Sequence, residues 1–160
     1  METEKFLSSA QELLTEWTIA VSEPESNRKD FKIAPENLKP AVQKLIDAHW
    51  GYLITITGLD QQLTNVDGTK SGMLELLYHF AVGNAIATLR IDLPYDGAKI
   101  ESICAIIPSA TIYEREIIDL FGVEIVDTPS TEHLILPEHW PDGVYPLRKS
   151  FTGLEQSKEA

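Results

Sequence analysis

The segment Met73-Leu-Glu-Leu-Leu-Tyr-His-Phe-Ala-Val-Gly-Asn-Ala-Ile-Ala-Thr-Leu-Arg-Ile-Asp-Leu93 predicts an antiparallel β-hairpin. Apolar residues alternate with other residues along Met73–Val82 and again along Ala85–Leu93, which gives each strand one apolar face. Gly83 and Asn84 lie between the strands and tolerate the positive φ of a two-residue hairpin turn. We therefore expect a mainly antiparallel sheet that contains this hairpin.

Two helices are predicted before the hairpin. The first has Thr3 as its N-cap and ends in the Pro-containing stretch 22–27. Its apolar residues recur at three- and four-residue intervals and are Phe6, Ala10, Leu13, Leu14 and Trp17. The second helix is predicted to run from Asn37 to His49 and to stop at Gly51. Shorter strands are expected at 31–33, 52–57 and 100–107.

A third, short helix is predicted after Pro108. Thr111 and Glu114 have the spacing of a capping box, in which each side chain satisfies a free backbone amide of the first turn. Arg115 and Asp119 have the spacing of an i,i+4 ion pair. Gly122 marks the C-terminal stop. The expected buried stripe is Tyr113, Ile117, Leu120 and Phe121.

These elements predict one α+β domain in which helices cover one face of a mainly antiparallel sheet. The core domain is assigned to residues 1–128, and an extended tail to residues 129–160. Helix-breaking prolines brace this tail at Pro129, Pro137, Pro141 and Pro146. Such a tail has little core of its own, so we expect it to lie across a surface and to dock on a partner subunit.

The composition excludes several classes of function. The chain has 160 residues with 13 Lys+Arg and 25 Asp+Glu, so its formal net charge is −12. Nucleic-acid affinity depends on Lys and Arg displacing counterions from phosphates, so we expect no nucleic-acid partner. No apolar run approaches the roughly 20 residues that cross a bilayer. The acidic start, METEKFLSSAQELL, has no secretory signal, so a cytoplasmic location is expected.

Metal, redox and nucleotide sites lack their usual residue patterns. Cys104 is the one cysteine and cannot supply the thiolates of an iron–sulfur cluster, so a redox centre must be held by a partner. We expect a buried, unreactive thiol there. The histidines, which do not stand at zinc-binding spacings, are His49, His79, His133 and His139. The glycines that match neither nucleotide fingerprint are Gly58, Gly68 and Gly72.

Acidic residues crowd the third helix and the short segment after it. Paired carboxylates can serve general acid–base chemistry, so a hydrolase built on Glu114, Glu116 and Asp119 is one alternative. At these spacings on a helix the three side chains do not converge, which favours a solvated or interface face. The one cluster of basic residues in the tail is Arg148 with Lys149, after Trp140 and Tyr145. Arginine beside aromatic residues suits a bidentate contact with a partner's carboxylate.

Three segments in the last third of the chain resemble the 30-kDa subunit of respiratory complex I, also called its C subunit, a module that also occurs in membrane-bound energy-converting nickel–iron (NiFe) hydrogenases. They are Tyr113-Glu-Arg-Glu-Ile-Ile-Asp-Leu-Phe-Gly-Val123, Leu134-Ile-Leu-Pro-Glu-His-Trp140 and Tyr145-Pro-Leu-Arg-Lys-Ser-Phe151. Ile56-Thr-Gly-Leu-Asp60 and Leu76-Leu-Tyr-His-Phe80 are similar to the family's earlier strands. The resemblance covers about residues 38 to 151 in order.

The sequence departs from the family after the third helix. Asp127-Thr-Pro129 and Thr131-Glu-His133 stand where the family usually has a Gly-His-Pro turn and an arginine-bearing segment. An anionic contact made by those arginines elsewhere is not expected here. The segment Trp140–Lys149 and the short chain resemble the hydrogenase branch more than a classical NADH dehydrogenase.

The resemblance implies a non-catalytic structural subunit, without cofactors of its own, in the hydrophilic arm of a membrane-bound oxidoreductase. Its implied partners are the large hydrogenase-like (49-kDa-type) subunit, the small iron–sulfur (20-kDa-type) subunit and, indirectly, the membrane subunits. Iron–sulfur clusters, and NiFe in the hydrogenase branch, would belong to those partners. The implied place is the inner face of the cell membrane, where the complex couples electron transfer to ion translocation.

We expect one set of residues to form or brace the main interface, with the tail wrapping the large subunit. The set is Tyr113, Glu114, Arg115, Glu116, Asp119, Phe121, Trp140, Tyr145, Pro146, Leu147, Arg148 and Lys149. The remaining alternative is a free-standing acidic adaptor outside any redox complex. The electron donor and acceptor and the translocated ion are properties of other subunits, and this sequence carries no information about them.

Overall fold

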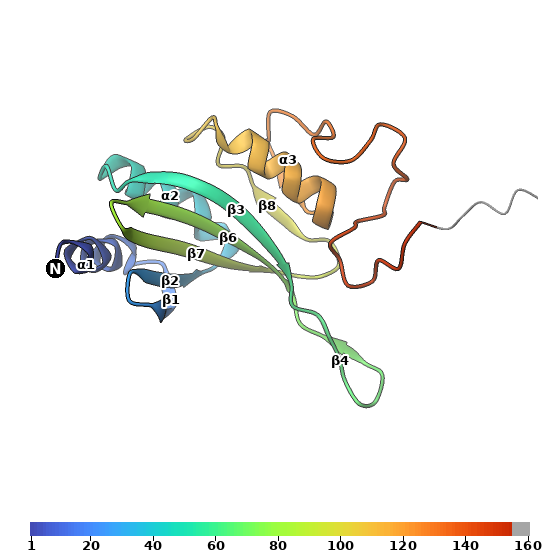
Figure 1. Cartoon of the computed structure of the whole chain (residues 1–160), viewed down its shortest axis with the longest axis horizontal. Coiled ribbons are helices and arrows are strands. Elements are labelled where there is room, and N and C mark those ends of the chain that lie inside the picture. The colour runs from blue at the N-terminus through green and yellow to red at the C-terminus, as the bar shows by residue number, and fades with distance from the viewer. Residues whose placement is uncertain (155–160) are drawn as a thin grey trace, which may run out of the picture.

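A computed structural model describes residues 1–154, so the last six residues of the predicted tail lie outside the described part of the chain. The helices are α1 (Glu2–Leu14), α2 (Leu38–Asp47) and α3 (Ala110–Phe121), and a short 3-10 turn, η1 (Pro35–Asn37), precedes α2. The main sheet contains β1 (Thr18–Glu25), β2 (Arg28–Ile33), β3 (Tyr52–Asp60), β6 (Leu74–Val82) and β7 (Ala85–Leu93). Two small ribbons pair β4 (Leu63–Thr64) with β5 (Lys70–Ser71) and β8 (Lys99–Glu101) with β9 (Glu124–Val126) (Figure 1).

The strand order of the main sheet is β1-β2-β7-β6-β3, and neighbours are antiparallel except for the parallel pair β2 and β7. The predicted hairpin is confirmed, because β6 and β7 pair without a register shift from Val82 and Ala85 to Leu74 and Leu93. Gly83 in its turn has a φ of 55°. The first helix was predicted to include Trp17 and to end in the stretch 22–27, but α1 ends at Leu14, and that stretch is the second half of β1 and its turn to β2.

All three helices share one core with the apolar face of the sheet. Alternate residues of β7, from Ala85 to Leu93, are fully buried, as are Tyr78 and Phe80 of β6. Helix residues that join the same cluster are Leu7, Ala10 and Leu14 of α1, Leu38, Val42 and Leu45 of α2, and Ala110, Ile117 and Phe121 of α3. The prediction of an α+β domain with helices on one face of a mainly antiparallel sheet is therefore confirmed.

The opposite face of the sheet carries a network of ion pairs. Asp30 is bound by Arg28 at 2.6 Å and by Arg90 at 3.2 Å, and Glu75 is bound by Lys32 at 2.7 Å and by Arg90. Burial acts to raise the pKa of Glu75, but the hydrogen bonds from Arg90 and Lys32 outweigh it and hold that pKa below its usual value. This network joins β2, β7 and β6 by their side chains.

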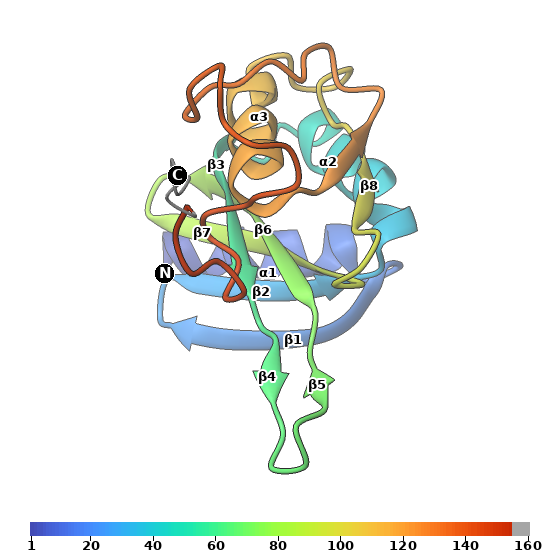
Figure 2. The ribbon, with the colours of Figure 1, turned by 90° about the vertical axis from the view of Figure 1, so that its right-hand side faces the viewer.

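The segments around α3 differ most from the sequence predictions. The strand expected at 100–107 is limited to β8, which ends at Glu101, and residues 102–107 turn around the buried Glu114 instead. Helix α1 begins one residue before the proposed cap Thr3, and its N-cap is Met1. After β9 the described chain has no further helix or strand up to residue 154, and Figure 2 shows this tail looping across α3 and returning beside β3.

Candidate interaction site: the tail bound to helix α3

The carboxylate of Asp119 holds the first bend of the tail. It accepts hydrogen bonds from Nδ1 of His133 at 2.7 Å and from the backbone amides of Leu134, Ile135 and Leu136 at 2.9, 3.0 and 3.2 Å. Three successive amides that point at one carboxylate form a small anion-binding nest. The buried acid of the helix thereby fixes the conformation of an exposed loop.

These contacts determine the protonation of Asp119. Burial by itself would raise the pKa of Asp119, since it disfavours the charged form. The hydrogen bonds from His133 and from the three amides oppose this effect and prevail, so the pKa of Asp119 lies below its usual value. The carboxylate of Asp119 is therefore ionised in the folded protein at neutral pH.

Glu114 lies on the other side of α3 and is completely buried. Its oxygens accept hydrogen bonds from Oγ of Ser102 at 2.8 Å, the amide of Ile103 at 2.8 Å and Oγ1 of Thr128 at 2.8 Å. The carboxylate links the loop after β8 to the start of the tail. The predicted capping box is wrong, because Glu114 makes these contacts and α3 has Ser109 as an N-cap without a side-chain bond.

Cys104 is part of this buried cluster. Its Sγ lies 3.1 Å from Oε2 of Glu114, and the side chain is nearly inaccessible to solvent. Burial and the neighbouring carboxylate raise the pKa of the Cys104 thiol to about 11. The prediction of a buried thiol is confirmed, and the raised pKa keeps it in the unreactive protonated form at neutral pH.

Two glycines let aromatic rings approach the backbone at this site. Gly122 ends α3 with a φ of 68°, and a Cβ there would lie 2.2 Å from the ring of Tyr145. Gly58 of β3 faces α3, and a Cβ there would lie 2.4 Å from the ring of Phe121. Gly122 therefore confirms the predicted helix stop and also provides the seat for Tyr145 in the tail.

Arg148 closes the C-terminal end of α3. Its Nε donates to the carbonyl oxygen of Phe121 at 2.6 Å, and its Nη1 donates to that of Tyr95 at 3.2 Å. The guanidinium also lies over the rings of Tyr95 and Tyr145, 4.8 and 5.3 Å from their centroids. A cation is favourable at this position because the last carbonyls of a helix carry partial negative charge.

Asp60, at the end of β3, holds the last part of the described tail. Its Oδ2 accepts hydrogen bonds from the hydroxyl of Tyr95 and from the amide of Lys149, each at 2.7 Å. Nζ of Lys149 donates to the carbonyl of Gln62 at 2.8 Å. Asp119 and Asp60 thus fasten the tail at two points, in addition to the contacts of Arg148.

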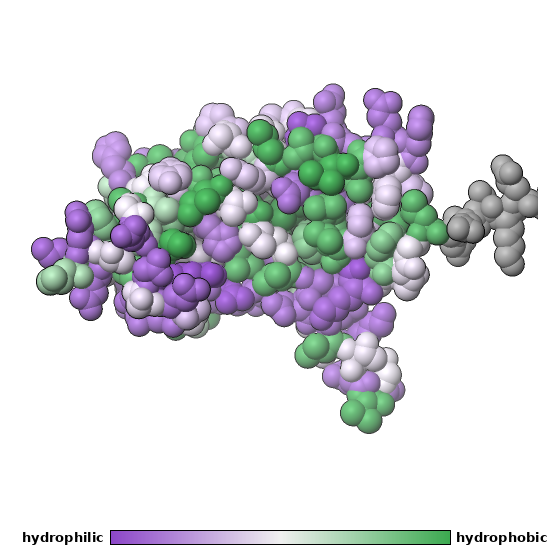
Figure 3. All heavy atoms as spheres, in the orientation of Figure 1, coloured by the Kyte–Doolittle hydropathy of each residue, from purple (hydrophilic) through white to green (hydrophobic). Residues whose placement is uncertain are grey.

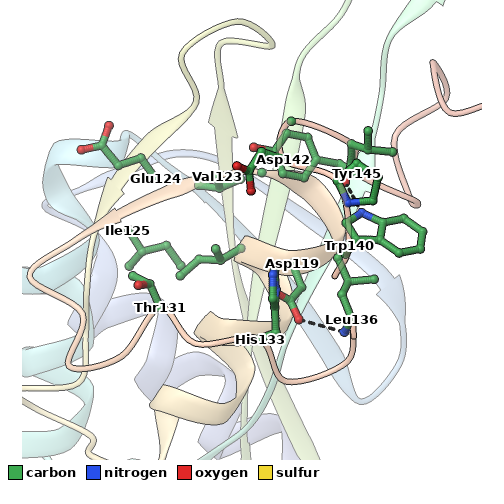
Figure 4. A pocket seen from close by; sticks show the side chains of 15 residues that line it. Asp119, Val123, Glu124, Ile125, Thr131, His133, Leu136, Trp140, Asp142 and Tyr145 are labelled. Atoms are coloured by element: carbon green, nitrogen blue, oxygen red, sulfur yellow. Dashed lines mark hydrogen bonds and ion pairs between the residues drawn. The ribbon is translucent and has the colours of Figure 1, made fainter. Parts of the chain in front are cut away.

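Between α3, β9 and the tail lies an open pocket of about 350 Å³. Its wall is mainly apolar, with Ile118, Ile125, Leu136 and Trp140 among the residues that line it. Figure 4 shows Asp119 next to His133 at this wall, together with the bond to the backbone of Leu136. Trp140 is held by its Nε1, which donates to the carbonyl of Val144 at 2.7 Å.

The outer surface of α3 and the tail exposes apolar side chains. These are Ile112, Leu134, Ile135 and Leu147, and we call them the apolar strip. Figure 3 shows apolar side chains gathered over α3 and the adjoining tail, whereas hydrophilic ones dominate over β1 and β2. Exposed apolar residues that adjoin one another mark surfaces that bind other molecules.

The structure brings most of the predicted interface residues to this site but gives them different roles. Glu114, Asp119 and Phe121 are buried, Leu147 and Lys149 are exposed, and the others are partly exposed. The predicted ion pair of Arg115 with Asp119 is wrong, since Arg115 donates to the carbonyls of Glu132 and His133. The proposed hydrolytic group does not converge, because Glu114 and Asp119 bind different segments.

Sequence reasoning missed several residues that hold the site together, namely Asp60, Tyr95, Ser102, Thr128 and His133. Each lies far in sequence from the group that it binds, as with Asp60 and Lys149 or Tyr95 and Arg148. No local spacing marks such contacts. The one available signal was the segment Ile56–Asp60, which belongs to the family resemblance.

The fold and the site together define a small α+β domain whose last helix is bound by its own C-terminal tail. A family described as the 30 Kd subunit of respiratory-chain NADH dehydrogenase matches residues 31–157. The match spans most of the chain, including α2, the strands β3, β6 and β7 of the main sheet, α3 and the described tail. The chain belongs to this family.

Individual relatives agree with this assignment. The C/D subunit of the NADH-quinone oxidoreductase of Methylococcus capsulatus is 34% identical over 65% of this chain and 18% of its own length. The C subunit of the F(420)H(2) dehydrogenase of Methanosarcina mazei is 33% identical over 57% of this chain and 58% of its own. Hydrogenase-4 component G of Escherichia coli is 31% identical over 71% of this chain and 20% of its own length. The chain thus spans between about a fifth and three fifths of these relatives.

Two solved structures share the fold. One is from the membrane-bound sulfane sulfur reductase, an archaeal respiratory membrane complex, with a TM-score of 0.65 at 20% identity over 94% of this chain and 86% of the other. The second is a trypsin-resistant fragment of Nqo5. Its TM-score is 0.58 at 21% identity, over 81% of this chain and 99% of the fragment. Within residues 1–154, none of the helices combines the length and the apolar character needed to span a membrane.

Proposed function

We propose that this protein is a structural subunit of the hydrophilic arm of a complex I-like membrane-bound oxidoreductase. It packs on the large hydrogenase-like subunit, next to the small iron–sulfur subunit, and supports electron transfer coupled to ion translocation. The observation that carries the proposal is the family match over residues 31–157, which includes the tail and the apolar strip. In this proposal the clusters, and NiFe in a hydrogenase, are held by the neighbouring subunits.

The domain organisation of two relatives supports a large subunit as the partner. In the C/D subunit of the NADH-quinone oxidoreductase and in hydrogenase-4 component G, the matching region is only about a fifth of a longer chain. A region that is joined to a second one in the same polypeptide is kept close to it. We infer that the equivalent second chain is the partner of this protein and that the complex lies at the cytoplasmic face of the cell membrane.

The geometry divides the predicted interface residues into two groups. Internally bonded side chains such as Asp119, Arg148 and Lys149 brace the tail, while in this proposal the apolar strip and the partly exposed ring of Trp140 face the partner. Preorganisation of this kind favours affinity because less conformational freedom is lost on binding. Ile135, Ile112 and Leu147, which are 57%, 52% and 52% exposed, are the strongest candidates for buried contact in the complex.

The proposal is tested by purifying the tagged full-length chain from native membranes. We expect iron–sulfur protein and a large hydrogenase-like subunit to copurify in fixed ratio, and mass spectrometry identifies them. Recovery of partners that include no redox protein would establish the adaptor alternative and overturn the proposal. Turnover of hydrolytic substrates by the purified chain, lost in Glu116→Gln, would also contradict it.

The interface itself is tested by charge substitution in the apolar strip. Ile135→Asp is expected to lower recovery of the large subunit about tenfold, the effect of losing roughly 1.4 kcal/mol of binding. Tyr52→Asp is the matched control, because Tyr52 is also exposed but lies at the far end of β3. Equal recovery with both variants, at low and high salt, would remove the apolar strip from the interface.

A further inference from the structure

The pocket between α3, β9 and the tail combines a mainly apolar wall with acidic side chains. Glu124 and Asp142 are exposed acids among the residues that line it, and none of the described lining residues is a Lys or an Arg. In Figure 4, Asp142 and Glu124 lie on one side of the pocket, and Asp119 with His133 lies on the other. The pocket therefore has an apolar interior and a negatively charged mouth.

The chain around this pocket reinforces the negative charge. Residues 116–147 contain seven Asp and Glu residues and no Lys or Arg, so they account for −7 of the net charge of −12. The arginines on either side of this stretch, Arg115 and Arg148, donate to backbone carbonyls of the tail and of α3. A surface with this charge attracts basic segments and repels acidic ones.

Asp142 is the carboxylate at the pocket that is available to a partner. Asp119 already accepts four hydrogen bonds, and Glu124 lies 3.7 Å from Nζ of Lys99. Asp142 is exposed, and none of the ion pairs formed within residues 1–154 includes it. A cation from another chain can therefore pair with Asp142 without displacing a contact inside this one.

A closed loop holds Asp142 at the mouth of the pocket. Nε1 of Trp140 donates to the carbonyl of Val144 at 2.7 Å across this loop. The ring of Pro141 fixes its own φ, and Gly143 accommodates a positive φ of 76°. The position of Asp142 is thus set before any partner binds, which favours affinity.

The chemistry of the pocket selects one kind of occupant. A purely apolar side chain would cover the wall but leave the charge of Asp142 desolvated and unpaired, and an acidic side chain would be repelled. Arginine satisfies both parts, since its stem is apolar and its guanidinium binds a carboxylate through two parallel hydrogen bonds. Arginine also packs on aromatic rings, which Trp140 and Tyr145 supply at the pocket, and it is enriched at protein interfaces.

We propose that this pocket receives an arginine side chain of the large subunit, with its stem on the apolar wall and its guanidinium paired with Asp142. The inference rests on the proposed function for the identity of the partner. It adds to the apolar strip a charged contact of fixed geometry, which selects the partner and its orientation. The acidic residues around the pocket speed the approach of such a basic segment.

The contact is located with a photo-cross-linking amino acid at position 144, which lines the pocket. After irradiation of intact membranes that contain the tagged full-length chain, we expect one main adduct, with the large subunit and within a few residues of an arginine. The same amino acid at position 52, exposed at the far end of β3, is the control and is expected to give no adduct with that segment. An adduct of position 144 with lipid, with a segment that lacks arginine, or with nothing at all would overturn the proposal.

Substitution of Asp142 measures the contribution of the ion pair. Asp142→Asn keeps the shape of the side chain and is expected to lower recovery of the large subunit about tenfold and to reduce its dependence on salt. Glu138→Gln is the matched control, because Glu138 is an exposed acid of the same tail that does not line the pocket. Its recovery is expected to stay within about twofold of the wild-type value. Both variants are expected to unfold at the wild-type urea concentration, since both side chains are exposed.

A charge exchange then tests the pair directly. Asp142→Arg is expected to abolish recovery of the large subunit, and replacing the arginine found beside the adduct by Asp is expected to restore it in part. Absence of this rescue, or equal recovery with Asp142→Asn and Glu138→Gln, would refute the pocket contact and leave the proposed function in place. Failure to recover any redox subunit with the wild-type chain would refute the proposed function instead.

Discussion

Gly122 performs two tasks that one residue can rarely combine. Its positive φ ends α3, and its missing side chain leaves space for Tyr145. The first task was predictable, since a glycine after an apolar helical stripe is a common stop signal. The second was not, because nothing in a local pattern tells which distant aromatic residue covers the glycine.

Replacing Gly122 by Ala tests both tasks at once. We expect a loss of about 3 kcal/mol in the free energy of unfolding, from the left-handed backbone and from overpacking against Tyr145. Gly143→Ala separates the two effects, because Gly143 has a φ of 76° but open space around its Cβ position. For this variant we expect a loss of about 1 kcal/mol in the free energy of unfolding, from the backbone conformation alone. Urea denaturation measures both. Equal losses for the two variants would show that the Tyr145 contact is not tight.

At the scale of elements, strands with long alternating patterns were predictable and the surroundings of α3 were not. The β6–β7 hairpin is confirmed in its register because the alternation of apolar residues and the Gly83-Asn84 turn agree. The spacings of Glu114 and of Arg115 with Asp119 suggested local helix contacts. In the structure these side chains instead bind groups that are distant in the sequence. A buried carboxylate is stabilised more by several hydrogen-bond donors than by one exposed ion pair.

The link between α3 and the tail is expected to depend on pH through Asp119. Its folded pKa lies below its unfolded value near 3.8. Its contribution to stability is therefore complete above that pH and is lost as the pH falls through the folded pKa. Asp119→Ala removes the acceptor of four donors, and we expect a loss of about 1–2 kcal/mol at neutral pH.

Hydrogen exchange provides the measurement for this prediction. In Asp119→Ala, the amides of Leu134, Ile135 and Leu136 are expected to exchange faster at neutral pH, while those of β7 change little. In the wild-type protein the same three amides are expected to lose protection selectively as the pH is lowered below 3.8. Unchanged protection in the variant would mean that another contact holds the bend.

For the whole molecule, the boundary predicted at residue 128 falls between regular structure and the tail, but the two parts are bonded to each other. Leu147 and Arg148 donate to the carbonyls of Leu120 and Phe121 at the end of α3. Removing residues 129–160 would leave these carbonyls and the buried Asp119 without those partners. The tail that was predicted to need a partner's surface therefore already has one on its own domain.

We expect the chain that ends at residue 128 to be destabilised by on the order of 4 kcal/mol, from the unpaired carboxylate and the lost contacts of Tyr145. Small domains are stable by about 5–15 kcal/mol, so this variant would lie near the limit of folding. The midpoint of urea unfolding measures the loss. A midpoint equal to that of the full chain would establish residues 1–128 as an independent domain.

The parallel pairing of β2 with β7 has a consequence for how the chain acquires its shape during synthesis. The ribbon of β1 and β2 leaves the ribosome before β7 has been made, and its neighbour in the sheet is absent until the β6–β7 hairpin has emerged. Because neighbouring strands joined by a tight turn meet quickly and distant ones slowly, we expect the hairpin to form first and the N-terminal ribbon to join it later. Until then, the nascent N-terminal ribbon has an open edge, which is where we expect the incomplete chain to be most prone to aggregation.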